Sequence, residues 1–100
     1  MADFLISGKM KVKTLRKDFK EAYTSTLRVY NGARFADDDA TLASIRKGDT
    51  KGGEVGVNGK MLVGNFEKKI FEEFGIKVQV ATADNLKLVD DKVTLTQSGK

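Results

Sequence analysis

Apolar side chains recur every three or four residues in two stretches of the chain. They are Leu15, Phe19, Ala22 and Tyr23 in the first stretch and Phe66, Ile70 and Phe74 in the second. This spacing places them on one face of an α-helix, so the pattern predicts two amphipathic helices, over 15–23 and 66–74. Thr14 and Asn65 stand directly before these stretches and are the expected N-cap residues, and Gly75 is expected to end the second helix.

A pair of short segments precedes each helix, and in the segment 9–13 apolar Met10 and Val12 alternate with lysines, which is the pattern of a half-buried strand. The paired segments are 3–6 with 9–13 and 54–57 with 60–63, and the residues between them are Ser7-Gly8 and Asn58-Gly59. Asn-Gly is a strong signal for a two-residue β-turn, because both central positions of that turn require a positive φ. The sequence therefore predicts a β-hairpin at the start of each half of the chain.

A strand is also predicted after each helix, because apolar residues, several of them β-branched, alternate with polar ones over 27–30 and 76–80. Asn31-Gly32 predicts a tight turn after the first of these strands. The corresponding segment 82–85 contains a two-residue insertion, so the two turns are expected to differ. A short strand is expected after each turn, which gives each half the order ββαβ(β).

The second half of the chain repeats the first. Adding 51 to the residue number gives an identical residue for Gly8, Lys9, Met10, Val12, Lys17, Glu21 and Val29. After the insertion the offset becomes 53, and 35–42 aligns with 88–95. We therefore predict a single α+β domain over 1–100, made of repeat one (3–45), a linker (46–53) and repeat two (54–98). The repeats are expected to be related by a pseudo-two-fold axis, each with one amphipathic helix on a sheet.

The two repeats are expected to share one hydrophobic core, because a unit of about 45 residues is close to the size below which a chain rarely folds alone. The residues predicted in this core are Met10, Val12, Leu15, Phe19, Tyr23, Leu27, Met61, Val63, Phe66, Ile70, Phe74, Val78 and Val80. The pattern leaves open whether the strands of the two repeats form one sheet or two.

The segment Val29-Tyr30-Asn31-Gly32-Ala33-Arg34-Phe35-Ala36-Asp37-Asp38, closing on Thr41-Leu42, resembles the last hairpin of ubiquitin-like (β-grasp) domains. The resemblance covers this one hairpin, and it implies a fold with ββαβ order. It implies no activity, because a fold does not determine a function. The Gly-Gly tail used for conjugation is not matched, since the sequence ends Gly99-Lys100.

The composition argues against several kinds of chemistry. The 100 residues include no cysteine and no histidine, so the sequence offers no disulfide, no thiolate and no imidazole for proton transfer or metal binding. No stretch approaches the roughly 20 apolar residues that span a bilayer, and no secretory leader is recognised. We therefore expect a non-catalytic, cytoplasmic protein without a cofactor or a metal ion.

Positive charge is concentrated in the first half of this small basic protein, whose net charge is +4. The candidate nucleic-acid-binding residues are Lys9, Lys11, Lys13, Arg16, Lys17, Lys20, Arg28, Tyr30 and Arg34. Basic side chains neutralise phosphates, and a tyrosine can stack on a base. The same lysines can instead form a solvated face that protects an edge strand from unwanted pairing. The second half has Leu62, Gly64 and Glu67 at the positions of three of these cations, which argues against a purely structural need for them.

Two other motifs are expected to be structural. Asp37-Asp38-Asp39 lacks the ligand spacing of an EF-hand loop, and the matching Asp90-Asp91 predicts the same turn in both halves. The glycine-rich segment 52–59 lacks the closing Gly-Lys-Ser/Thr of a phosphate-binding loop.

These observations predict a protein-interaction module, with nucleic-acid binding through the basic face as the alternative. Exposed strand edges and the apolar residues Leu62 and Phe71 are candidate contact surfaces. We expect the partner to be a protein, with nucleic acid possible and no membrane, and the chain to be a monomer or a weak homodimer.

Overall fold

The structure, a computed structural model, describes residues 3–46 and 54–99, so most of the predicted linker lies outside the described residues. The fold is a compact α+β fold. In chain order the elements are β1 (Phe4–Ile6), α1 (Val12–Tyr23), β2 (Thr26–Asn31), β3 (Arg34–Phe35), α2 (Leu42–Ile45), β4 (Val55–Val57), α3 (Val63–Phe74), β5 (Val78–Ala81) and α4 (Leu95–Ser98). The predicted α+β class is confirmed.

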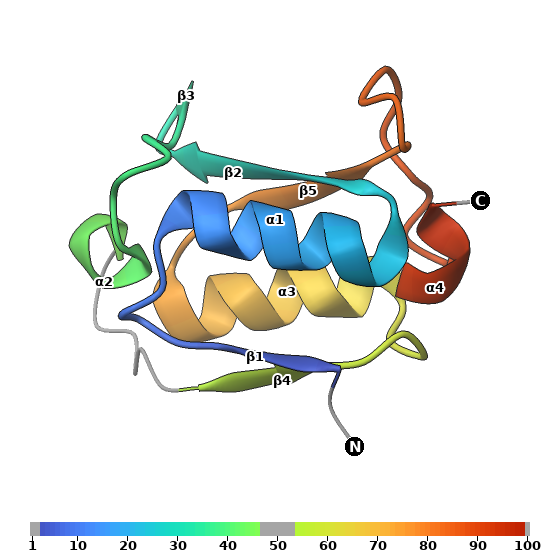
Figure 1. The fold of residues 1–100 in the computed structure, drawn as a ribbon, viewed down its shortest axis with the longest axis horizontal. Coiled ribbons are helices and arrows are strands. Elements are labelled where there is room, and N and C mark those ends of the chain that lie inside the picture. The colour runs from blue at the N-terminus through green and yellow to red at the C-terminus, as the bar shows by residue number, and fades with distance from the viewer. Residues whose placement is uncertain (1–2, 47–53, 100) are drawn as a thin grey trace.

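The strands of the described residues form two separate sheets. β1 pairs antiparallel with β4, and the second sheet has the antiparallel order β3-β2-β5. Figure 1 shows α1 and α3 running in opposite directions between the two sheets, with β2 and β5 along one side and β1 and β4 along the other. The β1–β4 and β2–β5 ladders each join a strand from the first half of the chain to one from the second, whereas the β2–β3 ladder lies within the first half.

The core lies between the helices and the sheets, and most of its predicted residues are confirmed as buried. Met10 and Met61 are only partly buried and pack against its edge. The rings of Phe19 and Phe66 lie at the centre of the helix pair, with centroids 5.4 Å apart. Further buried residues, which were not among those predicted in the core, include Ile6, Val29, Leu42, Ile45, Val55, Val57, Ile76 and Leu95.

The predicted hairpins at the start of each half are wrong. After β1 and after β4 the chain makes a turn and enters a helix directly, and Lys11 and Leu62 form single bridges to Thr41 and Thr94 instead of pairing with the preceding strand. Val12 is three residues before Leu15 and seven before Phe19, so it belongs to the apolar stripe of α1. Over so short a segment, alternation fits a strand and the first turn of a helix equally well.

The predicted N-caps are also wrong. Thr14 and Asn65 lie inside the first turn of their helices, and Lys11 and Leu62 occupy the N-cap positions without a side-chain hydrogen bond. The first amide groups of each helix need partners, as in any α-helix. They donate instead to backbone carbonyl oxygens from the segment before the next short helix, a contact that the local sequence cannot reveal.

These carbonyl contacts repeat in the two halves. In α1 the amide of Val12 donates to the carbonyl of Ala40 over 2.9 Å, and the amide of Lys13 donates to that of Asp38 over 3.0 Å. In α3 the amides of Val63 and Gly64 donate to the carbonyls of Val93 and Asp91 over 2.8 and 3.0 Å. The aspartate turns therefore hold the N-terminal ends of the two long helices.

The short strand expected after the first turn is confirmed as β3, whereas after the second turn the described residues form a single bridge between Ala81 and Leu88. Beyond each aspartate turn lies a short helix that was not predicted. Thr41 and Thr94 cap these helices, α2 and α4, and the hydroxyl oxygen of each accepts from the amide three residues later over 3.2 Å. The predicted difference between the two turns is confirmed: β2 and β3 are joined by the tight turn 32–33, whereas a longer loop over 82–87 follows β5.

Candidate functional site

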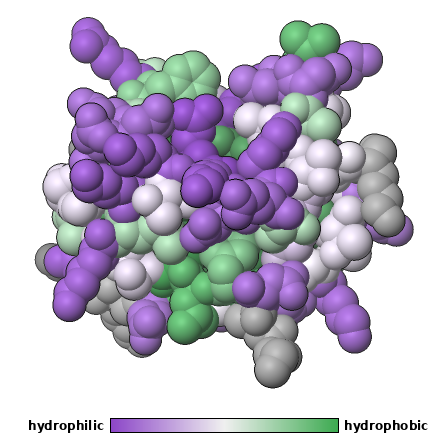
Figure 2. Space-filling view, viewed as in Figure 1, coloured by the Kyte–Doolittle hydropathy of each residue, from purple (hydrophilic) through white to green (hydrophobic). Residues whose placement is uncertain are grey.

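Four basic side chains of α1 line a groove between this helix and β2. They are Lys13, Arg16, Lys17 and Lys20, whose spacing places them on one side of the helix. The groove has a volume of about 300 Å³ and is completed by Thr26, Leu27 and Asp38. Figure 2 shows hydrophilic side chains gathered on this face of the molecule.

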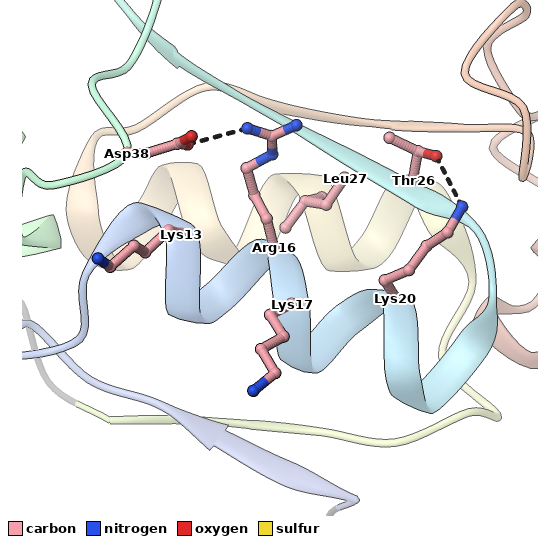
Figure 3. A pocket seen from close by; sticks show the side chains of 7 residues that line it. All are labelled: Lys13, Arg16, Lys17, Lys20, Thr26, Leu27 and Asp38. Carbon is pink, nitrogen blue, oxygen red and sulfur yellow. Dashed lines mark hydrogen bonds and ion pairs between the residues drawn. The ribbon is translucent and has the colours of Figure 1, made fainter.

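The four side chains do not all point into the groove. Figure 3 shows Arg16 reaching up toward β2 and Lys20 reaching toward Thr26, whereas the ammonium groups of Lys13 and Lys17 point away from β2. Arg16 and Lys20 are therefore the cations closest to the strand. The other two are exposed lysines on long, flexible side chains that can turn toward a ligand in the groove.

The edge of β2 that faces the groove is largely unpaired. The opposite edge pairs with β5 from Thr26 to Val29, but β3 pairs with β2 only at Tyr30 and Asn31. Within the described part of the chain, no strand pairs with β2 at Leu27 on the groove side. This part of β2 is a strand edge bordered by cations.

The direction of the backbone groups follows from the pairing. The amide of Tyr30 donates to Lys77 on the β5 side over 2.9 Å, and the carbonyl of Val29 accepts from Ala36 on the other side, also over 2.9 Å. Because adjacent residues of an antiparallel strand point their backbone groups in opposite directions, those of Leu27 point the same way as those of Val29. The amide and carbonyl of Leu27 therefore face the groove.

Two aspartates of the 37–39 turn neutralise part of the basic row. Arg16 Nη1 lies 2.9 Å from Asp38 Oδ1, and Lys13 Nζ lies 3.2 Å from Asp39 Oδ1. Both pairs are exposed to solvent, and such ion pairs contribute only about 0–1 kcal/mol. Asp37 Oδ1 accepts from the amide of Asp39 over 2.9 Å, which confirms the predicted structural role of this turn.

Lys20 and Arg28 hold the loop that follows β5. Lys20 Nζ donates to the carbonyl of Ala83 over 2.6 Å and to Thr26 Oγ1 over 3.3 Å. Arg28 donates from Nε to Asn85 Oδ1 over 2.8 Å and from Nη2 to the carbonyl of the same residue over 2.9 Å. These two candidate nucleic-acid contacts thus have structural partners.

The remaining candidates lie away from the groove. The Tyr30 ring stacks on Phe35 with centroids 5.0 Å apart, and its hydroxyl donates to Gln79 Oε1 over 2.8 Å. Lys9 and Lys11 are exposed in the turn before α1, and Arg34 is exposed beside the turn that joins β2 and β3. The structure therefore brings together the α1 cations, but it does not gather all nine predicted residues into one surface.

Most of the basic residues that line the groove are not repeated in the second half of the chain. The positions 51 residues after Lys13, Arg16 and Lys20 hold Gly64, Glu67 and Phe71, and only Lys17 has a basic counterpart, Lys68. The groove is therefore a feature of the first half.

Glu67 accepts one hydrogen bond from the strand edge of β5, the edge that corresponds to the groove side of β2. Its Oε2 accepts from the amide of Val80 in β5 over 3.0 Å. Burial raises the pKa of the Glu67 carboxyl; the nearby Asp91 carboxylate raises it further, whereas the Val80 amide and the Lys77 ammonium lower it. The Glu67 carboxylate thus accepts from an amide at the edge of β5. Arg16, at the matching position in α1, cannot accept a hydrogen bond from an amide.

Comparison of the chain with known protein families, with curated proteins and with solved structures found no match. Across 3–46 and 54–99, no helix has the length and apolar character needed to cross a membrane. The same residues contain no group of three or more carboxylates placed to hold a metal ion. The function is therefore inferred from the geometry of the groove.

Proposed function

We propose that this protein is a non-catalytic protein-interaction module whose binding site is the groove between α1 and β2. The observation that carries the proposal is the unpaired edge of β2 at Leu27 beside the α1 cations. A strand edge presents amide and carbonyl groups at the spacing of another extended chain, and the neighbouring side chains select which chain is bound. The site thus combines main-chain recognition with a preference based on charge.

Nucleic-acid binding is the alternative proposal, and exposed Lys9, Lys11 and Lys17 favour it. Only four of the nine candidate residues line the groove, so a phosphate backbone lying in it would contact fewer than half of them. A base would also meet a tyrosine ring that already stacks on a neighbouring phenylalanine. We therefore rank protein binding above nucleic-acid binding.

Panning of the immobilised chain against a displayed library of random peptides tests this proposal. We expect enrichment of related peptides, and we expect each of them, once synthesised, to shift the backbone amide resonances of 13–20 and 26–29 as one surface. A mixed-sequence oligonucleotide is titrated in parallel at low and physiological salt. No enriched peptide, together with a salt-sensitive oligonucleotide response on the same surface, would reverse the ranking.

We also propose that the two halves are tandem repeats related by a pseudo-two-fold axis. The proposal is supported by α1 and α3, which have 12 residues each and begin 51 residues apart. It is further supported by the strand pairing. Around a two-fold axis, the residue nearest the axis pairs with its own equivalent. Leu5 pairs with Gly56 and Arg28 pairs with Gln79, and in both pairs the residue numbers differ by 51.

A further inference from the structure

We infer that the groove binds an acidic, extended segment of a partner protein, which adds as a strand to β2 and replaces Asp38 as the ion-pair partner of Arg16. The inference rests on the proposed function and specifies the chemistry of the partner. It has three parts: the main chain of the segment pairs with Leu27, its carboxylates meet the cations of α1, and the 37–39 turn competes with it.

The spacing of the groove fits a strand that carries an acidic residue at every second position. Arg16 and Lys20 are four residues apart on α1, a rise of about 6 Å along the helix axis. Side chains on one face of a strand are two residues apart, or about 7 Å. Two carboxylates at positions i and i+2 of the bound segment can therefore reach these two cations together, because Lys20, which donates to Ala83 and Thr26, has a third N–H for a carboxylate.

The charges around the groove favour the same ligand. Of the four α1 cations that line it, Lys17 has no acidic partner among the described residues, and Lys13 and Arg16 are held only by exposed ion pairs. Exposed pairs are weak, so a carboxylate supplied by a bound strand can exchange with them. A neutral segment would gain the main-chain hydrogen bonds alone, and a basic segment would be repelled.

Asp38 competes with the carboxylates of the bound segment for the Arg16 guanidinium. Its carboxylate holds the Arg16 guanidinium, which Figure 3 shows reaching over β2. Its backbone carbonyl separately accepts from the amide of Lys13 at the start of α1. Asp38→Asn keeps the carbonyl but removes the charge, so it should free Arg16 without loss of the contact that holds the helix end.

The second half of the chain indicates a substitution that should weaken binding. Glu67 stands at the position that matches Arg16, and its carboxylate accepts from the amide of the adjacent strand. Arg16→Glu therefore copies an arrangement that the fold already tolerates, and it places a negative charge in the groove. Lys68→Glu makes the same change in net charge at an exposed position of α3 and is the matched control.

The test uses a labelled, end-capped peptide in which glutamate and valine alternate over seven positions, and its affinity for the full chain is measured by fluorescence anisotropy. A peptide of the same composition with all glutamates at one end is the control for charge alone. We expect the alternating peptide to bind at least about tenfold more tightly than the block peptide. We expect Asp38→Asn to tighten binding by about threefold to fivefold, Arg16→Glu to abolish it, and Lys68→Glu to leave it unchanged.

N-methylated peptides test the strand pairing itself. Amides on alternate residues of a strand point to opposite edges, so only one alternate set can pair with β2. We expect methylation of one set, either the glutamates or the valines, to abolish binding and methylation of the other set to be tolerated. Equal binding by both methylated forms, or equal binding by the alternating and block peptides, would overturn the inference. If these peptides fail but others from the library bind, the inference fails and the proposed function stands.

Discussion

The ring of Phe19 in α1 packs against the ring of Phe66 in α3, with centroids 5.4 Å apart, and both side chains are fully buried. The two rings come from different halves of the chain and meet between the two sheets. We expect Phe66→Ala to lower the free energy of unfolding by about 3–5 kcal/mol, because the variant loses a buried ring and leaves a cavity. Chemical denaturation monitored by circular dichroism measures this loss.

Phe71→Ala is the control on the same helix. The Phe71 side chain is 59% exposed, so its removal should change the free energy of unfolding by no more than about 0.5 kcal/mol. A cost for Phe71→Ala as large as that for Phe66→Ala would show that Phe71 is covered in solution, for example in a homodimer.

The shared core also predicts the behaviour of the separate halves. Among the described residues β1 pairs with β4 alone and β2 pairs with β5, so a fragment of residues 1–50 or 51–100 loses a partner strand from each sheet as well as half of the core. We expect each fragment to be unfolded as a monomer and an equimolar mixture to regain the helical signal in circular dichroism. A fragment that folds as a monomer, as judged by sedimentation, would contradict a shared core.

The ends of the two long helices give a reciprocal pair of predictions. Thr24 and Gly75 both adopt the left-handed conformation that ends a helix, with φ of 70° and 66°. A β-branched side chain is strained there, so Thr24→Gly should stabilise the protein by up to about 1 kcal/mol. Gly75→Ala should destabilise it by a similar amount. Thermal unfolding of both variants checks the signs, and two shifts in the same direction would exclude this explanation.

The positions of the helix starts can be tested with two threonines. Thr94 caps α4, and its side chain and that of Gln97 form a capping box, so Thr94→Ala should cost about 1 kcal/mol. Thr14 lies inside α1 and is exposed, so Thr14→Ala should be neutral or should stabilise the protein by up to about 0.7 kcal/mol. A clear loss of stability in Thr14→Ala would instead support the N-cap that the sequence pattern predicted.

These threonines illustrate how far the sequence could predict the fold. The amphipathic helices and most of the core followed from a periodicity that depends only on neighbouring residues, as at Leu15 and Phe19. The helix starts did not, because the carbonyl groups that replace the side-chain caps come from residues far along the chain, such as Ala40 for Val12. The opening hairpins failed because short alternation has two structural solutions.

The candidate site was predictable to a similar extent. The α1 cations are close in sequence, so their helical spacing was visible at once. The open edge at Leu27 was not, because it depends on which strands pair and on how short β3 is. The pairing of Arg16 with Asp38 joins residues 22 positions apart. The contrast between Arg16 and Glu67 was the one local signal that the edges of β2 and β5 have different neighbours.

Glu67 provides a prediction for the pH dependence of stability. Burial, its largest influence, raises the pKa of this carboxyl above the ordinary value of 4.5, and Asp91 raises it further, against the opposing effects of the Val80 amide and Lys77. Between the unfolded and the folded pKa, the folded protein binds more protons than the unfolded chain. The contribution of Glu67 to the free energy of unfolding therefore falls as the pH rises through that window.

Glu67→Gln removes this titration, and its side-chain oxygen can still accept from the amide of Val80. We therefore expect the variant to gain stability relative to the parent protein as the pH rises from about 4 toward neutrality, with the gain complete above the folded pKa. Denaturant unfolding at a series of pH values measures the difference. Glu72→Gln makes the same change in net charge at an exposed position of α3 and reports the effect of net charge alone. A difference between Glu67→Gln and the parent that is constant with pH, or that moves in the opposite direction, would mean that burial does not govern this carboxyl.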